Sequence, residues 1–382
     1  MKRKTGRFEK QSSGTESFSS YIPLALPPNP SLQINELLDV YEKANQELGR
    51  LDTVVESLPH PDHFLYMYVR KEAVLSSQIE GAQSSLSDLL LFENHEDPRT
   101  SMKDVTEVSN YVKAMRYGLE KLKGGFPLSL RLIREIHKVL LDGSRGGHKD
   151  PGEFRRSQNW IGGTRPGNAA YVPPPPHMVM SVMGDLENFL HERRSDIPPL
   201  LKAGLAHAQF ETIHPFLDGN GRLGRLLITF ILCADSVITE PLLYLSLFFK
   251  ENRSQYYDLL QKTRTDGELE AWMRFYLEGI ARVSREAREA ARKILDLFEE
   301  DRKKILRLGK GAATCLKIHE ILKEKGILSL TEAAKRLKIS YPAISKAVKN
   351  LEKIKLVQEI TKRQRNRLFS YEAYLSIISA GI

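Results

Sequence analysis

The apolar side chains of this 382-residue chain recur at spacings of three and four along most of its length. Ile34, Leu37, Leu38 and Tyr41 are an early example of the pattern. This spacing places apolar side chains on one face of an α-helix, whereas the side chains of a strand alternate between two faces. The sequence therefore predicts a mainly all-α fold, and its length predicts more than one domain because a domain usually has about 150 residues.

The helices expected before residue 306 share this spacing. The first starts at Leu32. The others are Pro61–Ile79, Leu86–Leu91, Thr106–Leu122, Ser129–Leu141, Met178–Glu192, Pro199–Thr212, Asn220–Ala234, Asn252–Thr263 and Leu269–Ile305. We expect a break in the last of these because it is so long. Residues 1–30 are polar and then rich in proline, which predicts a disordered or extended arm. Gly152–Pro176 contains Gly-Gly, Pro-Gly and four consecutive prolines, which predicts a short β-hairpin, or flap.

Residues 306–382 predict a linker, Leu306–Gly311, and a second compact unit. Its expected elements are helices at Cys315–Lys325, Leu330–Leu337 and Tyr341–Lys353 and a strand pair at Leu356–Thr361 and Arg367–Tyr371. Two helices, a turn, a third helix and a basic hairpin resemble a winged helix-turn-helix. We therefore expect a small winged helix domain at the C-terminus.

The net charge of +9 is concentrated in this second unit, where Lys335 to Arg367 holds eleven Lys or Arg against two Glu. A local excess of this kind indicates a partner, and DNA is the expected one. The predicted DNA-binding residues lie on the outward face of the third helix and in the wing: Tyr341, Ser345, Lys346, Lys349, Arg363 and Arg365. Ala343 is expected to face inward. A solvated basic face, or docking on another protein, is the alternative.

The stretch from His214 to Arg225, HPFLDGNGRLGR, combines an imidazole, a carboxylate and two guanidinium groups with an amide that is flanked by two glycines. Gly219 and Gly221 allow positive φ angles, so successive N–H groups can converge on phosphate oxygens. The apolar run that follows predicts a helix whose N-terminus points at the same anion. These residues therefore predict a site for a nucleoside triphosphate.

Each charged residue of this stretch suits one task at such a site. His214 suits a general base, since an imidazole titrates near neutrality and can take a proton from a hydroxyl. Asp218 is expected to hold Mg²⁺, which prefers carboxylate and phosphate oxygens. Arg222 and Arg225 are three residues apart at the start of a helix, so they share a face and can bind phosphates together.

The same stretch resembles the signature of the Fic family, HPFx(D/E)GNGRxxR, and matches it at every specified position. The resemblance implies a Fic-type helical core at residues 106–305. It also implies an enzyme, a protein adenylyltransferase that moves AMP from MgATP to a Ser, Thr or Tyr hydroxyl of a protein, itself included. The residues expected to hold ATP are Gly219, Asn220, Gly221, Arg222 and Arg225. Transfer of UMP, phosphate or phosphocholine is a further alternative.

A second stretch, Ser76 to Gly81, resembles the inhibitory motif of that family, (S/T)xxxE(G/N), with Ser76, Glu80 and Gly81 at the matching positions. The resemblance implies that Glu80 pairs with Arg225 and occupies the place of the γ-phosphate. Residues 31–105 would then be an N-terminal helical region that contains an inhibitory helix. On their own, Ser, Glu and Gly at a helix end are ordinary capping residues.

Two further contacts follow from the resemblance. The flap would align the target protein by strand addition, through Ile161, Gly162, Gly163 and Thr164. Tyr257 would contact the adenosine, although a tyrosine at helical spacing is more often a core residue. We expect Trp160 to lie in the core. Arg264 stands where some relatives have Asn, which leaves the preference for adenine open.

The remaining observations concern location and partners. No run of eighteen apolar residues is present, so no membrane contact is expected, and the N-terminus lacks the apolar segment of a secretory signal. The two cysteines lack metal-ligand spacing, which is typical of free thiols in the cytoplasm. We expect a homodimer. An alternative function is a DNA-binding transcriptional regulator that uses the Fic domain as a nucleotide sensor.

Overall fold

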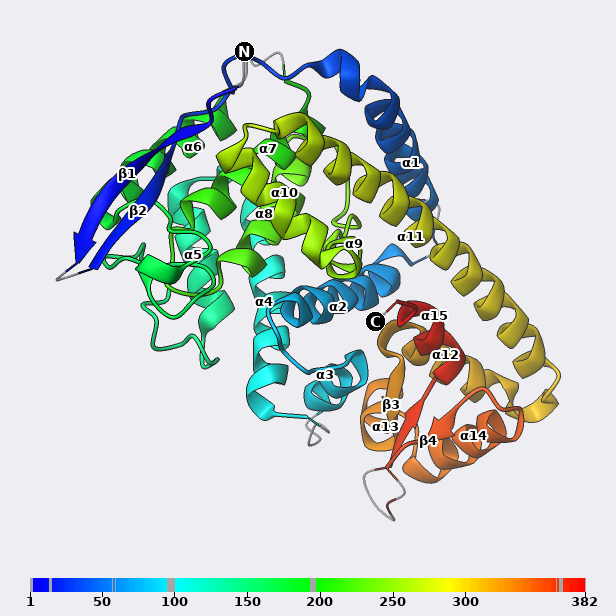
Figure 1. The fold of residues 1–382 in the computed structure, drawn as a ribbon. Helices are drawn as coiled ribbons and strands as arrows, with labels where there is room; N and C mark the ends of the chain where they lie inside the picture. The colour runs from blue at the N-terminus through cyan, green and yellow to red at the C-terminus, as the bar shows by residue number, and fades with distance from the viewer. Residues whose placement is uncertain are drawn as a thin grey trace.

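The computed structural model describes residues 3–13, 16–56, 58, 60–94, 100–192, 197–361, 363 and 367–381. Helices make up most of this part of the chain, which confirms the predicted all-α class (Figure 1). The elements of the first 306 residues, after an N-terminal hairpin, are η1 (Ile34–Leu37), α1 (Leu38–Glu56), α2 (Pro61–Ile79), α3 (Leu86–Glu93), α4 (Met102–Lys123), α5 (Leu130–Leu141), η2 (Pro166–Asn168), η3 (Pro176–Met178), α6 (Val179–His191), α7 (Pro199–Ile213), α8 (Asn220–Ala234), α9 (Ser246–Glu251), α10 (Arg253–Thr265) and α11 (Leu269–Leu306).

Helix α8 lies at the centre of this helical body, in contact with α7, α4 and α5. Its side chains from Arg222 to Leu232 are all buried, as expected of a helix that is apolar around most of its circumference. Helix α11 is continuous, so the expected break in it is wrong. Gly279 does not interrupt α11, because the ring of Phe248 on α9 packs where a side chain would lie.

An antiparallel hairpin stands at the N-terminus, formed by β1 (Gly6–Ser13) and β2 (Glu16–Pro23) in the register Gly6 to Pro23. It extends away from the helical body (Figure 1). These strands are extended but ordered by their pairing, so the predicted disorder is wrong for them. The reason is tertiary: Tyr21 and Ile22 at the base of β2 are buried, and Thr5 Oγ1 donates a hydrogen bond to the carbonyl of Thr263 on α10.

The C-terminal unit is a winged helix, as predicted. Its elements are η4 (Gly309–Gly311), α12 (Ala312–Lys325), β3 (Ile327–Ser329), α13 (Leu330–Leu337), α14 (Tyr341–Lys353), β4 (Gln358–Glu359), β5 (Leu368–Ser370) and α15 (Glu372–Ile378). The strands form an antiparallel sheet in the order β3-β5-β4. Strands β4 and β5 are shorter than expected, and β3 and α15 were not predicted. Ala343 is exposed, so its predicted inward orientation is wrong.

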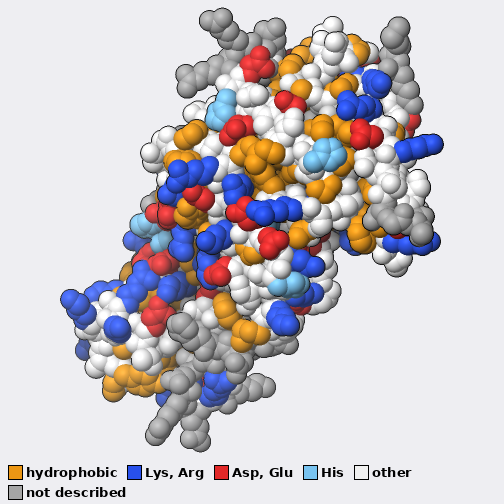
Figure 2. Space-filling model, turned by 90° about the vertical axis from the view of Figure 1, so that its left-hand side faces the viewer, with side chains coloured by type: hydrophobic (Ala, Val, Ile, Leu, Met, Phe, Trp, Pro, Cys, Tyr) orange, Lys and Arg blue, Asp and Glu red, His pale blue; other side chains and the backbone are white. Residues whose placement is uncertain are grey.

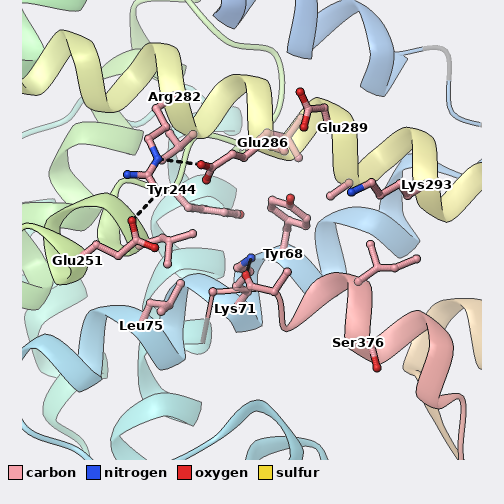
Figure 3. Close-up of a pocket in the computed structure, with 18 residues that line it drawn as sticks. Tyr68, Lys71, Leu75, Tyr244, Glu251, Arg282, Glu286, Glu289, Lys293 and Ser376 are labelled. Carbon is pink, nitrogen blue, oxygen red and sulfur yellow. Dashed lines mark hydrogen bonds and ion pairs between the residues drawn. The ribbon is translucent and has the colours of Figure 1, made fainter.

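Helix α2 is shared between the two units. It packs against α4 and α9 of the helical body and against α12 and α15 of the winged helix. Lys71 Nζ of α2 donates a 2.6 Å hydrogen bond to the carbonyl of Ala380, just after α15. A cavity of about 470 Å³ lies here between α2, α9, α11 and α15, and Arg282 on its wall pairs with Glu251 and Glu286 (Figure 3). The two units therefore meet along α2 and also along α11, which packs against α12 and α15.

The cysteines and the helix lengths bear on two of the sequence predictions. Cys233 and Cys315 are free cysteines, the first half-buried and the second buried. Within the described ranges, no helix has the length and apolar character that crossing a bilayer needs.

Candidate active site

The loop between α7 and α8 is held by its own backbone and by one amide side chain. His214, at the end of α7, and Gly219, just before α8, both have positive φ angles, 47° and 76°. The side chain of Asn220 accepts a 2.9 Å hydrogen bond from the N–H of Phe216 and donates a 2.8 Å bond to its carbonyl. The Asn220 side chain is therefore occupied within the loop and shapes it.

His137 on α5 supports the same loop from below. Its ring stacks on Phe216 with centroids 3.7 Å apart, and its Nε2 donates to the carbonyl of Asp218 at 3.0 Å. Its Nδ1 accepts from the N–H of Gly152 at 2.9 Å, which fixes the tautomer. Burial lowers the pKa of His137 to about 4, so the ring is neutral. Sequence reasoning missed His137, because a single histidine in an apolar helix carries no local signal.

His214 has a neutral imidazole beside the loop. Burial, together with the positive charges of Arg264 and Arg155, lowers its pKa to about 3. Its Nδ1 is buried, has no hydrogen-bond partner in the described part of the chain and lies 3.8 Å from Glu211 Oε2. The backbone carbonyl of His214 accepts bonds from Arg155 and Asn159. Nε2 is therefore the nitrogen left to take a proton, and it is deprotonated at physiological pH.

Glu80, the residue after α2, contacts Arg225 on α8. Arg225 NH2 lies 2.8 Å from Glu80 Oε1, and Nε of the same guanidinium donates to Ser76 Oγ at 2.8 Å. Burial alone would raise the pKa of Glu80, but the charge and hydrogen bond of Arg225 outweigh it and lower the pKa. The carboxylate is therefore ionised. A Cβ at Gly221 would collide with Glu80 Oε1, so this carboxylate lies directly on the first turn of α8.

Arg222, the other arginine at the start of α8, has guanidinium N–H groups without hydrogen-bond partners among the described residues. Its side chain is only 3% exposed, and it lies 3.4 Å from Asp218 Oδ1 and 3.8 Å from Glu107 Oε1 on α4. Its Nε and NH1 are buried without a hydrogen-bond partner in the described part of the chain. A buried guanidinium with open donors favours an additional anion. Glu107 is a second site residue that sequence reasoning missed.

Asp218 has the chemistry of a ligand for a hard cation. Its side chain is 40% exposed beside the start of α8, and Oδ1 accepts a 2.6 Å bond from the N–H of Gly219. Among the described residues, no group of three or more His, Cys, Asp or Glu side chains is placed to hold a metal ion. A Mg²⁺ ion on Asp218 would therefore take further ligands from phosphate oxygens and water, which is its usual habit at nucleotide sites.

Two tyrosines of α10 differ in position. Tyr256 is buried and donates a 2.9 Å hydrogen bond to His207 Nε2, so it is a core residue. Tyr257 is 39% exposed, and Glu80 and Arg225 are close enough to influence the pKa of its hydroxyl, which burial raises. Arg264 is buried, 3.9 Å from the centre of the Tyr171 ring. Arg264 therefore supports the flap in a buried position.

The flap is held by one pair of backbone hydrogen bonds, which Ile161 and Tyr171 exchange at 2.8 and 3.1 Å. These bonds use both backbone groups of Ile161, and the N–H of Thr164 donates to Asn168 Oδ1. Both backbone groups of Ile161 and the N–H of Thr164 are thus engaged within the flap, and target docking through Ile161 to Thr164 stays a prediction. Trp160 is 39% exposed, so its expected place in the core is also wrong.

In a planar trans peptide the C=O and the N–H point in opposite directions, and this holds for the peptides before and after Ile161. The carbonyl of Trp160 and the N–H of Gly162 therefore point away from Tyr171, and neither has a hydrogen-bond partner among the described residues. Asn159 ties the start of this strand to the catalytic loop, because its Nδ2 donates to the carbonyls of His214 and Phe216. The flap thus has a free edge, Trp160 to Gly162, that begins beside His214.

The outward face of α14 is basic. Tyr341, Lys346 and Lys349 are exposed and Ser345 is half-buried. Arg363 of the wing is exposed, whereas Arg365 lies outside the described residues. Lys and Arg side chains, with acidic ones among them, are frequent toward the lower part of the face in Figure 2, the level at which Figure 1 places the winged helix.

Known proteins share both the sequence and the fold. The protein adenylyltransferases Fic of Drosophila grimshawi and Drosophila melanogaster are 34% and 33% identical to this chain over 179 residues, which is 46% of the chain and 33% and 32% of those proteins. The chain thus spans about a third of the length of these relatives. A Fic family protein from Desulfovibrio desulfuricans has the same fold, with a TM-score of 0.56 and 19% identity over 88% of this chain and 95% of that one.

A similar likeness holds for Fic-1 of C. elegans, with a TM-score of 0.51 and 23% identity over 69% of this chain and 75% of that one. Residues 38–120 match the N-terminal region of the Fic/DOC family, and residues 127–232 match the Fic/DOC family itself. Residues 314–358 match the winged helix-turn-helix DNA-binding family. The chain therefore contains the N-terminal and Fic regions of the Fic/DOC family, followed by a winged helix-turn-helix domain.

Proposed function

We propose that this protein is an adenylyltransferase that moves AMP from ATP to a hydroxyl of a protein and that Glu80 restrains it. One observation carries the proposal: two buried guanidiniums and the N-terminus of α8 converge beside a deprotonated imidazole. The relatives named protein adenylyltransferase Fic support the same reaction. The phosphates of ATP would bind on Arg222, Arg225 and the backbone of Gly219 to Gly221, where the α8 dipole favours negative charge.

The chemistry is a displacement at the α-phosphorus. The target hydroxyl oxygen forms a bond to that phosphorus, the bond to the β-phosphate oxygen breaks, and pyrophosphate leaves. His214 Nε2 takes the proton of the hydroxyl as the new bond forms. Asp218 would hold Mg²⁺, which when bound neutralises part of the phosphate charge. The exposed ring of Tyr257 would contact the adenosine.

Glu80 explains how the site would be restrained. Its carboxylate lies on the first turn of α8 and pairs with Arg225, so it occupies the volume and the cation that a γ-phosphate needs. ATP would then bind with its phosphates displaced from the position that suits attack at the α-phosphorus. Release of the Glu80 carboxylate from Arg225 would free both the guanidinium and the volume for the γ-phosphate.

Intact-mass spectrometry after incubation with MgATP tests the proposed reaction. We expect Glu80→Gly to gain the mass of one or more AMP units and the double variant Glu80→Gly, His214→Ala to gain none. A gain that survives in the double variant, or no gain in Glu80→Gly with any added protein acceptor, would contradict the proposal.

Glu107 adds negative charge to the same site. Glu107 Oε1 lies 3.8 Å from Arg222 NH1 and 4.0 Å from Nε of Arg145, so it is the carboxylate nearest the open donors of Arg222. A phosphate on Arg222 would be repelled by this carboxylate, so we expect Glu107→Gln to tighten binding of a non-hydrolysable ATP analogue about fivefold. Titration calorimetry measures the effect, and Glu120→Gln, an exposed change on the same helix, is the control. Weaker binding in Glu107→Gln would show instead that Glu107 positions Arg222 or holds the metal ion.

A second function, DNA binding, is favoured by the exposed basic face of α14 and by the family match of residues 314–358. We expect Lys346→Glu with Lys349→Glu to weaken binding of a mixed-sequence duplex. Each phosphate contact that is lost lowers the slope of log K against log salt by about 0.9. Fluorescence anisotropy at several salt concentrations measures it. The pair Lys43→Glu with Lys103→Glu, which makes the same charge change on α1 and α4, is the control, and an equal loss in both pairs would contradict specific use of α14.

A further inference from the structure

The base of the β1–β2 hairpin is fixed to the helical body. Arg3 makes two hydrogen bonds of 2.6 Å to the carboxylate of Glu270 on α11, and its side chain is only 7% exposed. Thr5 bonds to the carbonyl of Thr263 on α10 at 2.6 Å. The first residues of the chain are therefore tied to two helices that also surround the candidate active site. The hairpin extends from this fixed base.

The far end of the hairpin contacts the flap. Glu16, the first residue of β2, accepts a 3.0 Å hydrogen bond from the N–H of Gly167 and lies 3.4 Å from Arg165 Nε. A Cβ at Gly167 would collide with Glu16 Oε1, so the carboxylate fits against a glycine backbone. The side chain of Glu16 is 25% exposed, which leaves this contact partly shielded from water. Glu16 thus holds the turn of the flap.

Tyr21, near the base of β2, meets the returning segment of the flap. The N–H of Tyr21 donates a 2.9 Å hydrogen bond to the carbonyl of Val172, and the rings of Tyr21 and Tyr171 lie 6.4 Å apart. Tyr171 in turn pairs with Ile161. The order across these segments is therefore β1, β2, Tyr171–Val172 and Ile161, with the hairpin on one side and the free edge of the flap on the other.

We propose that the β1–β2 hairpin positions the flap for the protein target and so forms part of the docking surface. This inference rests on the proposed transferase function. The partner is an extended segment that carries a hydroxyl, because the carbonyl of Trp160 and the N–H of Gly162 offer one acceptor and one donor to a neighbouring strand. The exposed ring of Trp160 adds apolar contact area. A segment bound there passes His214, since Asn159 ties the edge to the carbonyl of that residue.

Glu16 is the positioning residue to test, and the hairpin supplies a matched control. Glu16→Ala removes the acceptor of the Gly167 N–H, whereas Glu16→Gln keeps an oxygen at the same place. Glu9→Ala removes a carboxylate from β1 that contacts Arg7 and Gln11 in the same strand and, among the described residues, makes no contact with the flap. Hydrogen exchange of the full chain, followed by mass spectrometry of the peptide that spans the flap, reports on the bond pair of Ile161 and Tyr171.

We expect Glu16→Ala to accelerate exchange of these two amides about fivefold, since loss of one ordinary, partly exposed hydrogen bond shifts a local opening equilibrium by about that factor. Glu16→Gln and Glu9→Ala should exchange like the wild type. Unchanged exchange in Glu16→Ala would overturn the inference.

The second measurement is transfer of AMP in trans, with the Glu80→Gly chain as enzyme and a tagged His214→Ala chain as acceptor. Adding Glu16→Ala to the enzyme should raise the KM for the acceptor about fivefold and change kcat little, whereas adding Glu9→Ala should change neither. A fall in kcat at constant KM, or no change at all, would overturn the inference. If the Glu80→Gly chain transfers no AMP to any acceptor, the proposed function fails, and hydrogen exchange still decides whether the hairpin holds the flap.

Discussion

Replacement of His214 by alanine is expected to lower the rate of AMP transfer about 10²–10⁴-fold, the usual contribution of a general base. The loss should appear in kcat, because the imidazole takes its proton only as the new bond forms and the phosphates bind on other residues. The change is measured in the Glu80→Gly background with ATP labelled at the α-phosphate. Calorimetry with an ATP analogue should show unchanged affinity. The control is His191→Ala, which removes an exposed imidazole from α6.

The pH dependence of the rate checks the same assignment. The pKa of His214 is about 3 because of burial and the neighbouring guanidiniums, which is well below the ordinary value. The imidazole therefore stays deprotonated as the pH falls from about 8 to about 6, whereas an exposed histidine with a pKa of about 6.5 would lose most of its base form. Burial raises the pKa of Glu211 to about 7, so it titrates in this window, and Glu211→Gln removes its contribution. A rate that still falls across this window in Glu211→Gln would contradict the assignment.

Replacement of Glu80 by glycine is expected to raise both the affinity for ATP and the transfer rate, each by about tenfold to a hundredfold. A hydrogen bond to a charged group contributes about 1.5–3 kcal/mol, and ATP must displace the one between Glu80 and Arg225 before its γ-phosphate can take that place. Glu80→Gln keeps the size of the side chain and removes its charge, so it should give an intermediate gain.

The matched control for this change is an ion pair that involves the same helix, α2. Glu93→Gln breaks an Arg–Glu pair of equal length, 2.8 Å, between Arg70 on α2 and α3, away from the candidate site. It should leave the affinity and the rate unchanged. An equal gain in Glu93→Gln would mean that loosening of α2, and not the charge of Glu80, limits the reaction.

The sequence predicted the local parts of the site well, for a physical reason. The α7–α8 loop and the start of α8 are contained in one continuous stretch, so residue type and spacing specify their geometry. The partner of Arg225 comes from 145 positions earlier, and it was expected only through the family resemblance. His137 and Glu107 come from distant helices as single residues, and neither belongs to a pattern that could announce its place.

The fold errors have a similar origin. The sequence of the two N-terminal strands shows only modest alternation of apolar and polar residues, and Tyr21, Ile22 and Arg3 are buried or bonded against helices that follow much later in the chain. The continuity of α11 depends on the Phe248 ring that covers Gly279. In both places a tertiary contact outweighs local preference, and local preference is all that a short window of sequence reports.

Helix α2 supports both the helical body and the winged helix. Its C-terminal end carries the Glu80 carboxylate, which covers the first turn of α8. Helices α12 and α15 pack against another of its sides. A fragment that stops after α11 would lack α12 and α15. It would leave Met67 and Tyr68, which are buried in the full chain, exposed to solvent. Such a fragment would expose apolar surface on the helix that restrains Arg225, so its kinetics would report on a different resting state from that of the whole protein.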